Sequence, residues 1–275
     1  MERSRPALAI KKCPLVYVVA QVRFSAVESI PKYIPAIQEV FRKEYPRFTR
    51  GEIRNLRLNP ASPPEMSVVP RFEFQNKERT CGIVVQSDSV GVHVSRYSSF
   101  DVFCSSLQYA MNTVHSVVTL GLIDRIGLRY VDVVRPSEGE ELSKYLHAGL
   151  LGLNDTEVGV RNSIRMSLYQ GETDSGTLLF RLTQRNDRGF LPPDVEPSPL
   201  SHDQPEIRPG EIVTLLDFDH FQDFNKEPLD FSTEVVLQYL WRLHDNTDLA
   251  FRAAVTPYAL NAWGAEERDD INRNH

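Results

Sequence analysis

Two arginines and a glycine share one face of a predicted strand near the middle of the chain. The segment from Arg125 to Val134 alternates with the two-residue period of a β-strand, which places Arg125, Gly127 and Arg129 on the same face. A guanidinium fork fits phosphate or carboxylate, and a glycine between the arginines lets a ligand approach the strand. These residues are therefore candidates for anion binding. In the alternative, the arginines pair with carboxylates on neighbouring strands and Gly127 makes room for a facing side chain.

Two aspartates further along the chain are candidate partners for these arginines. Asp217 and Asp219 share a face of the predicted strand 211–220, and His220 follows them. Paired carboxylates can hold a divalent metal, but a metal needs further ligands, and no HxxxH, HExxH or Cys/His pattern occurs. Acids that alternate with apolar residues on a half-buried strand explain the pattern equally well. We expect neither a metal nor any other cofactor.

A basic segment with interleaved aromatic residues lies between positions 42 and 57. Its basic residues are Arg42, Lys43, Arg47, Arg50, Arg54 and Arg57. This composition is the nearest approach of the chain to a nucleic-acid surface. A solvated helix face followed by a basic loop gives the same composition, so nucleic-acid binding is not the favoured interpretation.

No sequence motif assigns a catalytic residue. The chain lacks a GxxxxGK[ST] loop, a GxGxxG turn after a strand and a GxSxG elbow. Histidines such as His93, His115 and His244 are scattered and form no triad pattern. Cys81 and Cys104 lie among apolar residues, which favours packing over nucleophilic chemistry. A non-enzymatic role is favoured, although the sequence leaves the question of catalysis open.

The elements that position these residues predict an α+β protein made of two similar units, each an antiparallel sheet followed by a long helix. The first unit spans residues 1–135. Its predicted strands are 15–24, 71–75, 81–86, 91–96 and the segment from 125, and its predicted helices are 29–45 and 103–120. Residues 59–70 contain four prolines and are expected to form a loop.

The second unit spans residues 136–265. Strands are predicted at 162–168, 177–183 and 211–220, and helices at 232–244 and between 249 and 263, with a break or new helix start at Thr256-Pro257. A Pro-rich insertion, 189–210, is the expected mobile or partner-bound loop. Residues 266–275 are expected to be a flexible tail.

Charge is distributed unevenly between the two predicted units. Residues 1–135 carry 19 Lys and Arg against 12 Asp and Glu, whereas residues 136–275 carry 12 against 25. This asymmetry suits attraction between the units better than a dense anion-binding tract. No apolar run is long enough to span a bilayer, no secretory segment is visible, and three cysteines show no pairing pattern, so we expect a cytoplasmic protein.

Several segments resemble a sporadically distributed family of bacterial proteins. They are the residues Arg125 to Tyr130 (RIGLRY), the preceding Tyr97 to Phe100, the opening strand around Val22 to Phe24, and 214–219 with 243–257. The resemblance covers nearly the whole chain, and RIGLRY is its most specific part. The family commonly has Asn after that element, where this chain has Val131-Asp132. The resemblance supports the architecture and implies no established activity.

Three functions are compatible with these features. The favoured one is a non-enzymatic module that binds a protein partner, and the patchy occurrence of the family suggests a defence or toxin–antitoxin-like setting. The second is a sensor or enzyme that holds a phosphorylated ligand with Arg125 and Arg129. The third is nucleic-acid binding through residues 42–57. The identity of a partner and the oligomeric state do not follow from the sequence.

Overall fold

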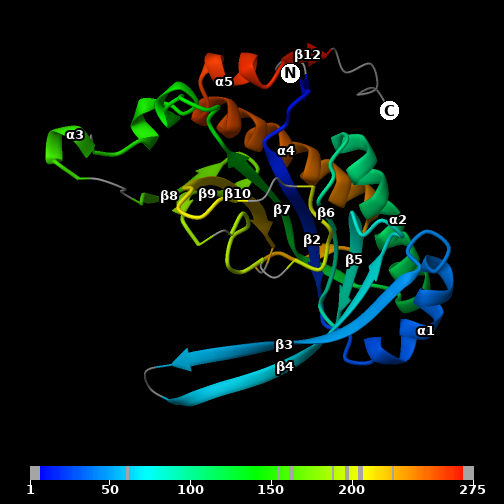
Figure 1. Cartoon of the computed structure of the whole chain (residues 1–275). Helices are drawn as coiled ribbons and strands as arrows, with labels where there is room; N and C mark the ends of the chain where they lie inside the picture. Colours follow the sequence, from blue (N-terminus) through cyan, green and yellow to red (C-terminus); the bar gives the residue numbers. More distant parts are fainter. Residues whose placement is uncertain are drawn as a thin grey trace.

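One large antiparallel sheet dominates the computed structural model, which describes residues 7–59, 62–153, 155–160, 164–187, 189–195, 198–203, 207–224 and 226–268 (Figure 1). The order across the sheet is β3 (Arg47–Asn59), β4 (Ser62–Gln75), β5 (Cys81–Gln86), β6 (Ser89–Val94), β2 (Leu15–Phe24), β7 (Leu122–Val134), β10 (Val213–Asp223), β9 (Gly176–Arg185) and β8 (Met166–Thr173). The short β11 (Leu229–Asp230) also pairs with β7. The predicted α+β class with antiparallel pairing is confirmed.

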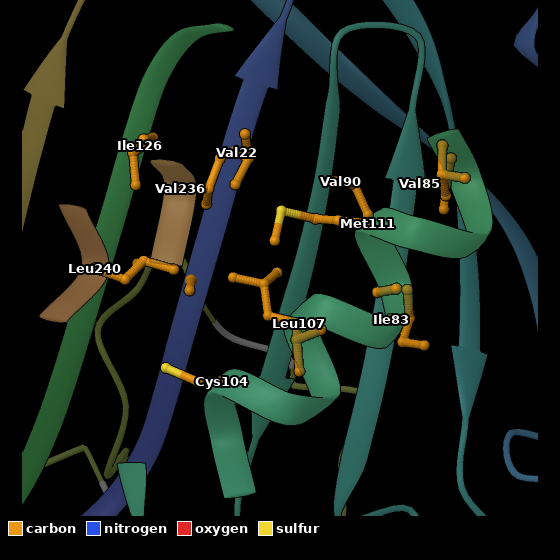
Figure 2. Close-up of a cluster of buried hydrophobic side chains, with 14 of the residues drawn as sticks. Val22, Ile83, Val85, Val90, Cys104, Leu107, Met111, Ile126, Val236 and Leu240 are labelled. Atoms are coloured by element: carbon orange, nitrogen blue, oxygen red, sulfur yellow. The ribbon is translucent and has the colours of Figure 1, made fainter. Parts of the chain in front are cut away.

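Three helices cover one face of this sheet: α1 (Ile30–Phe41), α2 (Phe100–Val118) and α4 (Thr233–Ala254). Alternate residues of the central strands β2 and β7 point toward them. Figure 2 shows Leu107 and Met111 of α2, with Val236 and Leu240 of α4, among the inward side chains of the central strands. Cys104 is buried in the same core, as its apolar surroundings predict. The opposite face of the sheet therefore presents the remaining alternate residues.

Polar caps set where the long helices begin. The Ser99 hydroxyl accepts a hydrogen bond from the Val102 amide at the start of α2, and the Ser232 hydroxyl does the same for Val235 in α4. Thr256 caps the short helix α5 (Pro257–Ala262), and Pro257 occupies its first turn. The prediction of a new helix start at Thr256-Pro257 is confirmed.

The sheet runs without interruption through the predicted boundary between the two units. Strand β7 pairs with β2 on one side and with β10 on the other, so residues on both sides of position 135 share one sheet. One core also contains Leu107 of α2 and Leu240 of α4. The helices are not all long, because α3 (Asp155–Val158) and α5 are short and two elements are single 3-10 turns, η1 (Leu142–Lys144) and η2 (Ala148–Leu150).

Several local predictions are wrong. The basic loop considered for part of 42–57 is strand β3, and α4 runs without a break through residues 245–248, between the two helices predicted there. Residues 62–70 are not a loop but the first part of β4, which pairs with β3 in the long ribbon that Figure 1 shows extending from the body. Proline lacks a backbone N–H and is tolerated on a strand edge that forms no ladder hydrogen bonds. Only residues Phe72–Gln75 of β4 pair with β5, so among the described residues the rest of that edge of β4 has no partner strand. The flexible tail was predicted to begin at residue 266, but residues up to Arg268 form β12 (Ala265–Arg268), which pairs with β1 (Ala7–Ile10). Residues 269–275 lie outside the described part.

Among the described residues, no helix is both long enough and apolar enough to cross a membrane.

Candidate functional site

A hollow of about 350 Å³ lies on the sheet face opposite the helices. It crosses the central strands β2, β7, β6 and β5 and reaches β4 and β10. Its lining residues are Tyr17, Val19, Gln21, Arg23, Arg71, Val84, Gln86, Gly91, Val92, His93, Arg125, Gly127, Leu128, Arg129, Asp194 and Asp219. Both arginines predicted from the sequence line it, as do Gly127 and Asp219.

Two glycines flank Gln21 in the floor of the hollow. The strand register places Gly127, Gln21 and Gly91 in one row across β7, β2 and β6. A Cβ atom on Gly91 would lie 2.9 Å from the Ala20 carbonyl oxygen, so only glycine fits at that position. A Cβ on Gly127 would lie 3.6 Å from the Phe221 Cβ, so Gly127 accommodates a facing side chain.

Arg129 lies at one side of the floor and is held by two carboxylates. Its Nε and Nη2 donate to the two oxygens of Asp217 at 2.7 and 2.9 Å, and Arg181 Nη1 donates to Asp217 Oδ2 at 2.8 Å. Its Nη1 and Nη2 also donate to Asp194 at 2.5 and 3.1 Å. Burial lowers the pKa of Arg129, but the hydrogen bonds that Arg129 donates to Asp194 and Asp217 outweigh it and raise the pKa. The ion-pair alternative considered for this arginine is therefore the arrangement found.

Arg125 is bound differently. Its guanidinium carbon lies 3.8 Å from the centre of the Phe221 ring, a stacking contact that leaves the N–H groups in the guanidinium plane available. Directly opposite, on β2, is the exposed Arg23. Within the described part of the chain, neither arginine forms an ion pair with a carboxylate. Arg23 did not stand out in the sequence because only the register places it beside Arg125.

The two acidic candidates occupy the same strand face, as predicted, and differ in their contacts. Asp217 is buried between Arg129 and Arg181. Asp219 lies opposite Arg129 in the register and lines the hollow. Burial raises the pKa of Asp219, and the charges of Arg129 and Arg125 oppose that rise. His220 points into the core on the other face, where its ring nitrogens bond to Thr173 and the Leu243 carbonyl. The described residues hold no cluster that fits a metal ion.

A buried polar chain forms another wall of the hollow. The Tyr17 hydroxyl lies 3.1 Å from His93 Nδ1, and His93 Nε2 lies 3.1 Å from Glu73 Oε1. Because a carboxylate only accepts, His93 donates from Nε2 and accepts from Tyr17 at Nδ1 when it is neutral. Burial raises the pKa of Glu73, but the bonds and charge of His93, with Gln75 and Arg71, lower it to about 2. The sequence analysis noted His93 as one of several scattered histidines, and no sequence pattern linked it to Tyr17 or Glu73.

Gly82 explains how the imidazole fits into this chain. A Cβ atom on Gly82 would lie 2.4 Å from His93 Nε2, so a side chain there would displace the ring from Glu73. The His93–Glu73 contact thus depends on a glycine on the neighbouring strand β5. Such a contact orders a polar core and also suits acid–base chemistry.

The Pro-rich insertion contributes Asp194 to the rim of the hollow. Its described parts pack on the open face of the sheet through the buried Leu191, Leu200 and Ile207, which contact a cluster around Val213 and Leu215. The insertion carries one carboxylate to Arg129.

The basic residues of positions 42–57 do not gather in the hollow. Arg42, at the end of α1, pairs with Glu39 of the same helix. Arg47 donates to the Lys77 carbonyl, and the Arg50 guanidinium lies 5.5 Å from the Phe72 ring centre. Lys43 is exposed beside the helix end. The side chains of Arg54 and Arg57 lie outside the described residues. The described members are spread from a helix end along the β3–β4 ribbon.

No family model matches the chain, and no curated protein is significantly similar to it.

Proposed function

We propose that the hollow binds a small anion, with a phosphorylated compound as the ligand class. The observation that carries the proposal is the pair Arg23 and Arg125, which face each other across β2 and β7. Asp223 lies opposite Arg125 on β10, but within the described residues neither arginine forms an ion pair with a carboxylate. Arg129, which the sequence placed in the same role, is already neutralised by Asp217 and Asp194. The anion site therefore moves from Arg125 and Arg129 to Arg125 and Arg23.

The energetics of the pair favour a ligand. Side chains directly opposite each other on antiparallel strands have Cβ atoms about 5 Å apart, and like charges in this position are destabilising. An anion bound between the guanidinium groups removes that repulsion and accepts several charge-assisted hydrogen bonds. Phe221 stacking on Arg125 fixes one guanidinium before the ligand arrives, which lowers the entropy lost on binding.

The test is a titration of the full chain with inorganic phosphate and with a phosphomonoester, followed by calorimetry and thermal stability. Wild type is expected to bind, and Arg23→Gln and Arg125→Gln are each expected to weaken binding by about tenfold or more, because a hydrogen bond to a charged group contributes about 1.5–3 kcal/mol. Arg242→Gln is the matched control, since Arg242 also lies over an aromatic ring, that of Tyr239, on the surface of α4. Equal affinity in all variants, or no binding by wild type, would contradict the proposal.

A second candidate function is the binding of a protein partner, favoured by the edge strand β8. Met166, Leu168 and Tyr169 are 79%, 66% and 62% exposed, and within the described residues no strand pairs with the outer side of β8. Large exposed apolar side chains on an open sheet edge mark surfaces that add a strand from another chain. Wild type should retain a stoichiometric partner from its native host, and Leu168→Lys should lose it; recovery of the wild-type chain alone would contradict this function.

Two further proposals concern the origin of the chain. The first is that the chain belongs to the sporadically distributed bacterial family, and the RIGLRY segment, Arg125 to Tyr130, supports it.

We also propose an internal duplication. The same order of elements occurs on both sides of the sheet centre: a central strand, a meander that approaches this strand from the edge of the sheet, and a helix. The register pairs Gln21 with Gly127, so Arg23 and Arg129 each lie two residues beyond the same central pair. The duplication would then have given two arginines, of which only Arg129 acquired acidic partners.

A further inference from the structure

The guanidinium group of Arg129 has two hydrogen-bonding edges, and a different carboxylate binds each of them. The inner edge is held by Asp217, whose side chain is 4% exposed and also binds Arg181. The outer edge is held by Asp194, whose side chain is 65% exposed and belongs to the insertion. Asp194 lies across the outer edge with one oxygen on each of two guanidinium nitrogens. The outer edge of Arg129 is therefore a carboxylate site that the chain itself occupies.

We propose that the hollow takes an elongated ligand with an anionic group at each end, one on Arg23 and Arg125 and the other on the outer edge of Arg129, where it displaces Asp194. The inference rests on the proposed anion site and adds a second subsite, with Asp194 as an internal competitor. It specifies the ligand class as a compound with two anionic groups rather than one.

The spacing of the arginines defines the reach of such a ligand. Arg125 and Arg129 are four residues apart on one strand face, which separates their Cα atoms by about 13 Å. Both side chains line the hollow, so a ligand of about this length can contact both arginines within it. Gly127 lies between the two arginines on β7, so no side chain of β7 itself separates the two ends on this face.

Asp194 is the more easily displaced of the two carboxylates, and the arginine stays in place when it leaves. Its side chain is 65% exposed and is hydrated after displacement, whereas the Asp217 side chain is 4% exposed. Asp217 continues to hold Nε and Nη2 of Arg129, so the outer fork keeps its position and its charge. Only the Asp194 side chain has to turn away, because Leu191 and Leu200 anchor the insertion on the sheet. A ligand anion can therefore replace Asp194 without rebuilding the site.

The experiment uses linear α,ω-alkane diphosphonates of increasing length, each compared with the monophosphonate of the same length, by calorimetry on the full chain. In wild type, one length should bind at least about tenfold tighter than its monophosphonate. Asp194→Asn should strengthen diphosphonate binding by about threefold or more, and should strengthen it more than it strengthens binding of the monophosphonate of the same length. Asp203→Asn, at an exposed acid of the same insertion that pairs with Arg96, should change neither.

The outcomes separate this inference from the proposed function. Phosphate binding that depends on Arg23 and Arg125, with no gain from a second phosphonate at any length and no effect of Asp194→Asn, would overturn the inference and leave the proposed function intact. Absence of phosphate binding by wild type would overturn both. A length optimum that disappears in Arg125→Gln supports both subsites.

Discussion

Asp132 is a buried carboxyl whose protonation is expected to set the pH dependence of stability. It lies on β7 between Leu216 of β10 and Leu15 of β2, and it is 4% exposed. Burial, with a smaller contribution from the negative charge of Asp217, raises the pKa of Asp132 from 3.8 to about 8. At neutral pH the folded protein thus keeps a proton that the unfolded chain has lost.

The sign and size of the effect follow from proton linkage. Because the pKa is higher in the folded state, the contribution of Asp132 to stability is complete below about pH 4 and is lost as the pH rises toward 8. Across that window the folded state binds one more proton than the unfolded state, so the free energy of unfolding falls by about 1.4 kcal/mol per pH unit from this group alone. Asp132→Asn removes the titration and retains a similar shape.

The measurement is urea unfolding of wild type and Asp132→Asn at pH 5, 6, 7 and 8. The difference in the free energy of unfolding, variant minus wild type, should rise by about 1.4 kcal/mol per pH unit. Between pH 5 and pH 7 it should therefore rise by about 2.7 kcal/mol. Other titrating groups are common to both proteins and cancel in the difference. Asp230→Asn, at an exposed aspartate of β11, should give a difference that does not change with pH. A pH-independent difference for Asp132→Asn would show that the carboxyl is not held protonated.

Three further changes test the described contacts. Asp217→Ala leaves Arg129 and Arg181 without their shared buried carboxylate and should lower the free energy of unfolding by about 3–5 kcal/mol; a loss below about 1 kcal/mol in chemical denaturation would refute the role of this pair. Gly82→Ala should cost about 1–3 kcal/mol because its Cβ would overlap His93, whereas Gly51→Ala, with no atom within 4 Å, should be nearly neutral, and equal effects would contradict the packing argument. If the β3–β4 ribbon binds nucleic acid, retention on heparin should fall with salt and should weaken in Arg47→Gln with Arg50→Gln; no retention at low salt would end that interpretation.

Local patterns in the sequence were sufficient for most elements of the fold. The period of two in residues 125–134 predicted β7, and the β-branched and aromatic residues of 15–24 predicted β2. Helical spacing predicted most of α2 and the first half of α4. Proline misled the prediction for residues 62–70, because proline content signals a loop only where both edges of a strand must form hydrogen bonds. The strand β12 was missed because its pairing with β1 joins the two ends of the chain.

The site was predictable only in part. Periodicity alone placed Arg125, Gly127 and Arg129 on one face of their strand. It also placed Asp217 and Asp219 together on one face of a second strand. It could not show that Arg129 is the arginine that meets Asp217, because that depends on β7 lying beside β10. The Tyr17–His93–Glu73 chain was invisible for the same reason, since its members come from three strands.

The sequence by itself determined which residues share a strand face, where the long helices begin, and which residue types are available for anion binding. The tertiary structure decided which of those residues meet. Strand order and register bring Arg23 opposite Arg125 although about 100 positions separate them, and they bring Asp217 and Asp194 to Arg129. The physical reason is that side-chain direction follows from local backbone geometry, whereas the neighbours across a sheet depend on the packing of the whole chain.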